Sequence, residues 1–119
     1  MPVKPLHIAI DGPIGSGKST VAKEISRRLN IFLIDAGALY RAAALVAIRH
    51  QIKPDKAASA AVLFRRAKVT ERKPLAQEID GRKITVLMDG EDISWVIRTH
   101  EIDDLVAKFG EHKEIIQAV

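Results

Sequence analysis

The chain has no cysteine, which excludes disulfide bonds and thiolate metal sites within it. Aromatic residues make up only 4% of the sequence, so few side chains are present on which nucleic-acid bases could stack. Apolar runs are short, and none approaches the length of a membrane span. These three absences disfavour disulfide scaffolds, nucleic-acid binders and membrane-spanning proteins, and they predict a soluble globular domain.

Charge is plentiful but dispersed. Nineteen Lys and Arg stand against fifteen Asp and Glu, for a net charge of +4, and the basic residues are scattered rather than gathered in one block. This distribution is typical of a solvated surface, so we expect no nucleic-acid partner. The first residues lead directly into an apolar segment instead of a signal peptide, which predicts a cytoplasmic location and no membrane partner.

Short apolar segments alternate with helical patterns over the first fifty residues. Residues 5–11 and 31–35 are apolar runs typical of buried parallel strands. Residues 18–29 place apolar side chains three or four apart, as in a helix with one buried side, and residues 38–50 read as a helix that is apolar nearly all round. This alternation predicts an α/β fold with a parallel sheet and helical crossovers.

The second half predicts a different kind of structure. A short helix over 56–67 precedes a region, 67–94, in which Asp-Gly pairs at 80–81 and 89–90 indicate a small antiparallel meander. The pair at 80–81 is expected to join strands at 75–79 and 82–88.

After the meander, Thr99 is expected to cap a helix that Gly110 interrupts, with a short helix from there to the end. We therefore predict a core at 1–53, an inserted subdomain at 54–98, and helices that return to the core at 99–119.

Residues 12–19 match the phosphate-binding pattern G-x-x-x-x-G-K-[ST] in full. In this pattern backbone N–H groups and a helix N-terminus surround phosphate oxygens, Lys18 reaches the β and γ phosphates, and the Ser19 hydroxyl binds Mg²⁺. A glycine-rich turn with a chance lysine is the alternative. The position between a predicted strand and a predicted helix favours the phosphate loop of a nucleoside triphosphate site.

Arg41 is the only charged residue between Ala36 and Ile48. A guanidinium among apolar side chains needs an anionic partner. The partner is either internal, such as Asp35, or the phosphate of a second ligand, and a third possibility is that the head group reaches solvent. The second interpretation, combined with the phosphate loop, indicates phosphoryl transfer to a phosphorylated acceptor, in which positioning and charge neutralisation supply most of the catalysis.

Three segments resemble, in order and separation, the N-terminal half of bacterial cytidylate kinases. They are IAIDGPIGSGKSTVAK at 8–23, IDAGALYRAAAL at 34–45 and MDGEDISWVIRTHEI at 88–102. The first fits any P-loop protein, whereas G-E-D-[IV]-S followed by I-R-T in the third is far more specific. Members of this family transfer the γ phosphate of ATP to CMP or dCMP.

The resemblance implies a P-loop NTPase-like fold, ATP and Mg²⁺ as cofactors, and small nucleotides as partners. It assigns the inserted subdomain to the acceptor, catalytic roles to Lys18 and Arg41, Mg²⁺ binding to Ser19, and acceptor binding to Arg41, Arg98 and Asp35. Arg98 has a surface role beside a helix as its alternative. The positions implied to bind ATP are Gly12, Pro13, Ile14, Gly15, Ser16, Gly17, Lys18, Ser19 and Thr20.

The chain also departs from the family pattern. Ala36 stands where relatives carry Ser or Thr, and an ungapped count places Ala107 and Ile116 where many carry a serine and an arginine that read cytosine. These replacements predict weaker selection for cytosine. Family members continue for about as many residues again, with a G-R-D segment, further parallel strands and lid arginines. We therefore predict a fragment or shortened product with doubtful activity, since missing lid arginines alone cost several orders of magnitude in rate.

Four hypotheses follow. The first is a cytidylate kinase by descent, and the second is a P-loop kinase for another small acceptor. The third is a non-catalytic nucleotide-binding remnant that binds another chain through an exposed sheet edge. A basic nucleic-acid binder ranks last. A complete protein would be a monomer, and a fragment would associate through the exposed edge.

Overall fold

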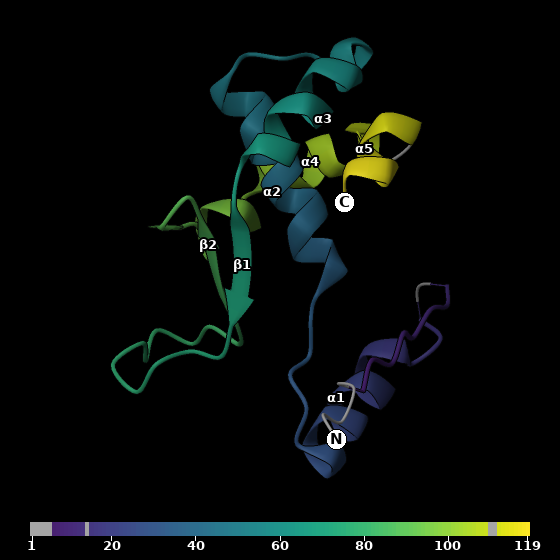
Figure 1. Cartoon of the computed structure of the whole chain (residues 1–119), viewed down its shortest axis with the longest axis vertical. Coiled ribbons are helices and arrows are strands. Elements are labelled where there is room, and N and C mark those ends of the chain that lie inside the picture. Colours follow the sequence, from purple (N-terminus) through teal and green to yellow (C-terminus); the bar gives the residue numbers. More distant parts are fainter. Residues whose placement is uncertain (1–5, 14, 110–111) are drawn as a thin grey trace, which may run out of the picture. The chain divides into compact units, whose positions relative to one another are not determined.

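The computed structural model describes residues 6–13, 15–109 and 112–119 (Figure 1). Contacts between residues divide the chain into two compact units, residues 1–33 and residues 34–119, called here the N-terminal unit and the C-terminal unit. This division differs from the predicted one at 1–53, 54–98 and 99–119. The predicted ranges separate expected functional parts of the chain, and they stay a prediction. No helix in the described part of the chain is long and apolar enough to cross a bilayer.

The described residues of the N-terminal unit contain one helix, α1 (Lys18–Leu29), which confirms the predicted bounds. Arg27 and Arg28 lie in its last turn, where positive charge is favoured by the helix dipole, and both pair with Glu24. Asn30 ends the helix in a left-handed conformation. No residue of α1 is buried: Val21 and Leu29 are exposed, and Ala22 and Ile25 are half-buried.

The two segments predicted as parallel strands do not form strands. Residues 6–11 and 31–35 are irregular, and the only sheet in the described residues is antiparallel. A parallel strand needs neighbours for its hydrogen bonds and cover on both faces, and two short segments supply neither. The mixed helix and strand class is confirmed, but the strands of the structure all lie in the C-terminal unit.

The centre of the C-terminal unit is helix α2 (Ala36–Arg49), which packs against α3 (Ala57–Arg66), α4 (His100–Phe109) and the 3₁₀ turn η2 (Val96–Arg98). Asp35 caps α2 by accepting a hydrogen bond from the Gly37 backbone N–H at 2.9 Å. The prediction of a largely buried helix is confirmed, because seven residues of α2 are buried.

Short elements complete the helical part of the C-terminal unit. The 3₁₀ turn η1 (Pro54–Lys56) leads into α3, and α5 (Lys113–Ala118) packs against α3. Thr99 precedes α4 as predicted, but its hydroxyl donates to the Val96 carbonyl at 3.3 Å. The predicted break at Gly110 lies outside the described residues.

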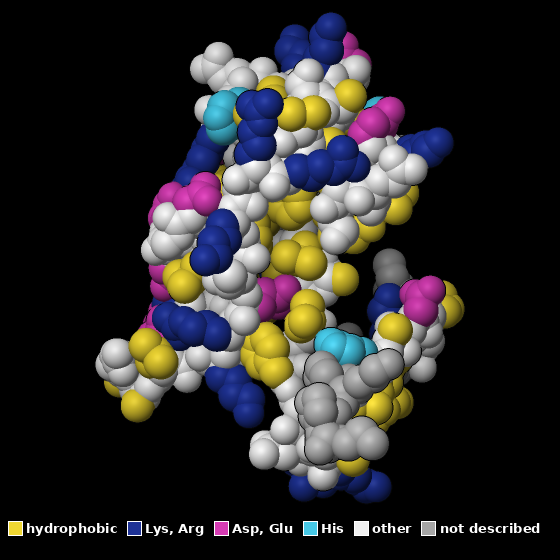
Figure 2. Space-filling model, in the orientation of Figure 1, with side chains coloured by type: hydrophobic (Ala, Val, Ile, Leu, Met, Phe, Trp, Pro, Cys, Tyr) yellow, Lys and Arg dark blue, Asp and Glu magenta, His cyan; other side chains and the backbone are white. Residues whose placement is uncertain are grey.

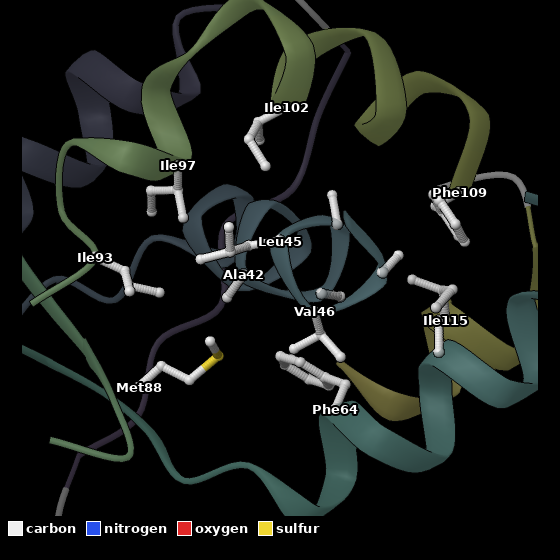
Figure 3. Close-up of a cluster of buried hydrophobic side chains, with 14 of the residues drawn as sticks. Ala42, Leu45, Val46, Phe64, Met88, Ile93, Ile97, Ile102, Phe109 and Ile115 are labelled. Carbon is white, nitrogen blue, oxygen red and sulfur yellow. The ribbon is translucent and has the colours of Figure 1, made fainter. Parts of the chain in front are cut away.

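Buried apolar side chains surround α2 on several sides (Figure 3). They come from α2 itself, from α3, from β2, from the segment around η2, and from α4 and α5. The larger members are Leu45, Val46, Phe64, Val86, Met88, Ile93, Ile97, Ile102, Phe109 and Ile115. Burial of this set supplies the main hydrophobic stabilisation of the unit.

The sheet has three short antiparallel strands in the order β1 (Val69–Arg72), β2 (Thr85–Met88), β3 (Glu91–Asp92). Asp89 and Gly90, both with positive φ, join β2 to β3 in a tight turn, as the Asp-Gly pair predicts. The prediction for the pair at 80–81 was wrong, because residues 75–79 form no strand and β2 pairs instead with residues 69–72.

An ionic network explains why residues 73–84 form a loop. The Arg82 side chain, only 9% exposed, donates to the carboxylates of Glu78, Asp80 and Asp92. Trp95 donates its indole N–H to Asp80 at 2.8 Å. The carboxylates of this segment therefore bind side chains, and Glu78 also accepts the Leu75 backbone N–H.

The same network shifts acid–base equilibria. Hydrogen bonds from Arg72, the Leu75 backbone N–H and Thr85 lower the pKa of Glu78 to about 2. The Arg82 guanidinium and the Trp95 indole hold the pKa of Asp80 below its ordinary value. The network therefore favours the ionised carboxylates.

Candidate functional site

The glycine-rich loop curves before α1 through two left-handed glycines. Gly15 has φ +82° and Gly17 has φ +88°, a backbone conformation that residues with a Cβ adopt only with strain. The Ser16 backbone N–H donates to the Pro13 carbonyl at 3.2 Å, which closes the turn. Gly17 is the N-cap of α1, and no side chain caps the helix there. Ile14 lies outside the described residues.

A pocket of about 360 Å³ lies at this loop, lined by Gly15, Gly17, Lys18, Ser19 and Thr20. The first backbone N–H groups of a helix have no partner within the helix, and the positive end of the helix dipole adds to them. These groups, with the Ser19 and Thr20 hydroxyls, form a surface of hydrogen-bond donors suited to phosphate oxygens.

Lys18 supplies the positive charge of the pocket. Its ammonium group donates to the Gly12 carbonyl at 2.8 Å, so the side chain folds back over the loop. The Gly12 backbone N–H in turn donates to the Asp11 carboxylate at 2.8 Å. Of the predicted loop residues, Gly15, Gly17, Lys18, Ser19 and Thr20 line the pocket. Gly12 accepts the Lys18 hydrogen bond, and Pro13 and Ser16 close the turn beside it.

Arg41 is the central residue of a second cluster, in the C-terminal unit. Its side chain is 26% exposed, donates to the Ile97 carbonyl at 3.1 Å, and forms an ion pair with Asp103 of α4. Of the interpretations open for Arg41, an internal salt bridge is present, but its partner is not Asp35. Asp35 and Arg41 are six residues apart, and positions with this separation lie on different faces of a helix.

Asp35 instead faces Arg98. An Arg98 guanidinium nitrogen lies 3.7 Å from the Asp35 carboxylate. On the other side, the Asp35 backbone N–H donates to Glu71 of β1 at 2.9 Å. Because Ile97 and Arg98 are adjacent in η2, the contacts of Arg41 and Arg98 join α2, η2, β1 and α4. We call this group the arginine–carboxylate cluster; its members are Asp35, Arg41, Glu71, Arg98 and Asp103.

Glu71 is the most unusual member of the cluster. One carboxylate oxygen accepts the Asp35 N–H, and the other is buried without a hydrogen-bond partner in the described residues. Burial raises the pKa of Glu71, and this effect outweighs the lowering by the Asp35 N–H and by Arg98. The cluster contains three carboxyl groups and two guanidinium groups, so its positive charge is already balanced from within.

Two members of the cluster, Asp103 and Glu71, were not predicted as site residues from the sequence. Both contact their partners across more than thirty residues of sequence. The one available signal was the isolated charge of Arg41, which requires an anion but does not identify it.

The positions that depart from the family pattern offer no side-chain hydrogen bond. Ala36 is the first residue of α2, and Ala107 and Ile116 lie exposed on α4 and α5. Within the residues that the structure describes, no group of three or more His, Asp or Glu side chains is placed to hold a metal ion. Lys, Arg, Asp and Glu side chains are interspersed over the visible face of the molecule (Figure 2), in agreement with the dispersed charge of the sequence.

Comparison with known proteins gives a consistent result. The sequence model of the cytidylate kinase family matches residues 8–119. The chain is 40% identical over 112 residues to a cytidylate kinase of Desulforamulus reducens, an alignment that covers 92% of this chain and 47% of that protein. It is 41% identical over 112 residues to a cytidylate kinase of Citrifermentans bemidjiense, covering 94% and 46% of the two chains.

A cytidylate kinase of Chloroflexus aggregans is 38% identical over 104 residues, which covers 87% of this chain and 44% of that protein. The chain therefore spans about half the length of the curated relatives it matches. The phosphate loop, the residues around Arg41 and the segment that ends at Arg98 all lie within the matched region. The chain belongs to the cytidylate kinase family.

Proposed function

We propose that the chain binds ATP with Mg²⁺ at the phosphate loop and contributes to phosphoryl transfer to CMP or dCMP. The observation that carries this proposal is the pocket at the N-terminus of α1, with Lys18 and two hydroxyls at its rim. Backbone N–H groups of residues 15–20 would hold the phosphates, and Lys18 would neutralise their charge. The residues that line the pocket fit the phosphates of ATP, because they offer hydrogen-bond donors and a cation, and no carboxylate.

The Ser19 hydroxyl is the residue that would hold Mg²⁺. An isolated hydroxyl is a weak ligand, but Mg²⁺ in kinase sites takes most of its ligands from phosphate and water. The ion would supply charge neutralisation for the transferred phosphoryl group. Lys18 would separate from the Gly12 carbonyl to reach the phosphates, which exchanges a hydrogen bond to a neutral oxygen for one to an anionic oxygen.

We further propose that the arginine–carboxylate cluster receives the acceptor. Arg41 and Arg98 would bind its phosphate, with Asp35 orienting Arg98, and residues 54–98 would form the acceptor subdomain between a core at 1–53 and the helices at 99–119. Support comes from the fact that both arginines lie next to Ile97: Arg41 donates to its carbonyl, and Arg98 follows it in η2. Planar guanidinium groups match phosphate geometry better than ammonium groups do.

The proposal is tested by binding and turnover of the 119-residue chain. Isothermal titration with ATP and Mg²⁺ should give saturable binding that Lys18→Ala weakens and Lys23→Ala preserves, because Lys23 lies on the exposed side of α1. A coupled assay with CMP, dCMP, UMP and AMP then identifies the acceptor. Turnover on CMP or dCMP supports the proposal, and turnover on another acceptor would favour the second hypothesis, consistent with Ala36, Ala107 and Ile116.

A second candidate function is a nucleotide-binding module that works with another polypeptide. The observation in its favour is that the N-terminal unit exposes several large apolar side chains, those of Leu6, Ile8, Ile10, Val21, Leu29 and Phe32. Exposed apolar side chains that gather in a patch mark interaction surfaces.

The partner in this second case would be a polypeptide equivalent to the half of the relatives that the chain does not span. Mixing the chain with that half of the Desulforamulus reducens protein tests it. Co-elution together with CMP-dependent ATP turnover, both lost in Val21→Asp, would support the module. Equal turnover with and without the added half would contradict it.

A further inference from the structure

The ion pair between Arg41 and Asp103 occupies a residue that the proposed function needs for the acceptor. Arg41 is the more buried partner, and Asp103 is 43% exposed. Arg41 is also anchored independently of Asp103, because its guanidinium donates to the Ile97 carbonyl. Removal of the Asp103 carboxylate would therefore leave Arg41 in place with an unsatisfied positive charge.

We propose that Asp103 is an affinity-setting residue: its carboxylate is an exchangeable counter-ion that a dianionic acceptor phosphate must displace from Arg41. This inference rests on the proposed function of the cluster as the acceptor site. It adds a residue of α4 to that site, in a role opposite to that of the arginines. Asp103 lowers the affinity for the acceptor instead of contributing to it.

The electrostatics of the cluster support this role. Arg41 and Arg98 face three carboxyl groups, those of Asp35, Glu71 and Asp103. An incoming phosphate therefore meets repulsion as well as attraction, and only the release of a carboxylate changes that balance. Asp35 caps α2 and Glu71 is held by the Asp35 N–H, so both are fixed by the backbone.

Asp103 can leave more easily than the other two carboxylates. Its side chain is 43% exposed, close to the 45% of Asp35, but among the described residues it accepts no backbone N–H, whereas Asp35 accepts that of Gly37. The Asp103 side chain can therefore rotate into water, and partly exposed ion pairs contribute little stability. A phosphate dianion offers Arg41 twice the charge and a bidentate geometry in exchange. Exchange therefore favours a doubly charged ligand over a singly charged one.

A purely structural role for Asp103 makes a different prediction. An acidic residue in the first turn of α4 stabilises the helix through its dipole. Under that role Asp103→Asn would lower thermal stability and leave ligand affinity unchanged. Affinity and stability are therefore the two readouts that separate the roles.

The experiment measures CMP binding to the 119-residue chain by isothermal titration, with thermal melting of each variant to verify folding. Asp103→Asn should tighten CMP binding roughly tenfold, since a unit charge beside a dianion is removed at short range. Asp104→Asn is the matched control, because it removes the same charge from the adjacent exposed position of α4, and it should change affinity less than about twofold. In an Arg41→Gln background the gain from Asp103→Asn should disappear.

Each other result overturns the inference. If the unmodified chain binds CMP and Asp103→Asn leaves the affinity unchanged or weaker, Asp103 does not compete with the acceptor, and the proposed function stands without it. An equal gain in Asp104→Asn, or a gain that persists in the Arg41→Gln background, would assign the effect to net charge. If neither the chain nor Asp103→Asn binds CMP, the acceptor site and this inference fail together.

Discussion

Helices α1 and α2 are of similar length, 12 and 14 residues, and each belongs to a candidate site: α1 follows the phosphate loop, and α2 carries Arg41. They differ in burial: α1 has no buried residue, whereas α2 has seven. The phosphate loop before α1 depends on local features, namely two left-handed glycines and a free helix N-terminus. The arginine–carboxylate cluster around α2 depends on tertiary packing of four elements. The proposed phosphate site can therefore form locally, whereas the proposed acceptor site needs a folded core.

The core of the C-terminal unit provides the largest test of this contrast. Phe109→Ala should lower the free energy of unfolding by about 3–5 kcal/mol, because it leaves a cavity among buried apolar side chains. Urea denaturation followed by circular dichroism measures the loss. Ile79→Ala, at a position that is 88% exposed, is the control and should cost less than about 0.5 kcal/mol. Equal losses in the two variants would mean that the unit has no single core.

Hydrogen exchange compares the two helices directly. Backbone amides of α1 should exchange at least about a hundredfold faster than those of α2, since helices without buried side chains open locally. Mass spectrometry of peptides covering 18–29 and 36–49 measures both rates in one sample. Equal protection of the two helices would contradict the contrast.

Lys18→Ala tests the local character of the phosphate loop. Removal of the ammonium group should weaken ATP binding by roughly tenfold to a hundredfold, the range for a charge-assisted hydrogen bond. The urea midpoint of the C-terminal unit should stay unchanged. A variant that lost CMP binding and ATP binding to the same extent would show that the two sites are not independent.

Acid titration gives the smallest expected effect. The pKa of Glu78 in the folded chain is about 2, below its ordinary value of 4.5. The stabilisation from Glu78 is therefore complete above pH 4.5 and is lost as the pH falls toward 2. Glu78→Gln should flatten the dependence of the melting temperature on pH in this window, whereas Glu101→Gln, on the exposed side of α4, should leave the curve parallel to that of the unmodified chain.

Glu71→Gln tests a carboxyl group whose pKa is shifted in the opposite direction from that of Glu78. Burial raises the pKa of Glu71, so its contribution is favourable at low pH and is lost as the pH rises through the raised value. An amide oxygen can still accept the Asp35 N–H without carrying a charge. Glu71→Gln should therefore preserve or raise the melting temperature at neutral pH, and a clear decrease would show that the cluster needs all three carboxylates.

The sequence predicted the features that depend on nearby residues. Helix α1, the burial of α2, the phosphate loop and the turn at Asp89 and Gly90 all follow from short patterns. The same reasoning failed for Asp80 and Gly81, because an identical pair of residues lies in a loop that Arg82 organises through side-chain bonds. It also failed for residues 6–11 and 31–35, because strands require partners that no local pattern supplies.

The candidate sites divide in the same way. The loop positions 12–19 are predicted from one motif and Thr20 from the family resemblance, with Ile14 outside the described residues. Arg41 was identified as a charge in need of a partner, but Asp103 and Glu71 were not, because their distances to α2 are set by packing between elements far apart in sequence. A single sequence indicates that a buried charge is satisfied and does not indicate by which residue.

The contact between Trp95 and Asp80 has a practical consequence. Trp95 is the only tryptophan of the chain, it is half exposed, and its indole nitrogen is tied to the loop at 73–84. Its fluorescence is therefore an intrinsic optical signal from the proposed acceptor subdomain. Any ligand that rearranges this loop changes the polarity around the indole, so the emission maximum can follow acceptor binding in real time, without a label or a coupled enzyme.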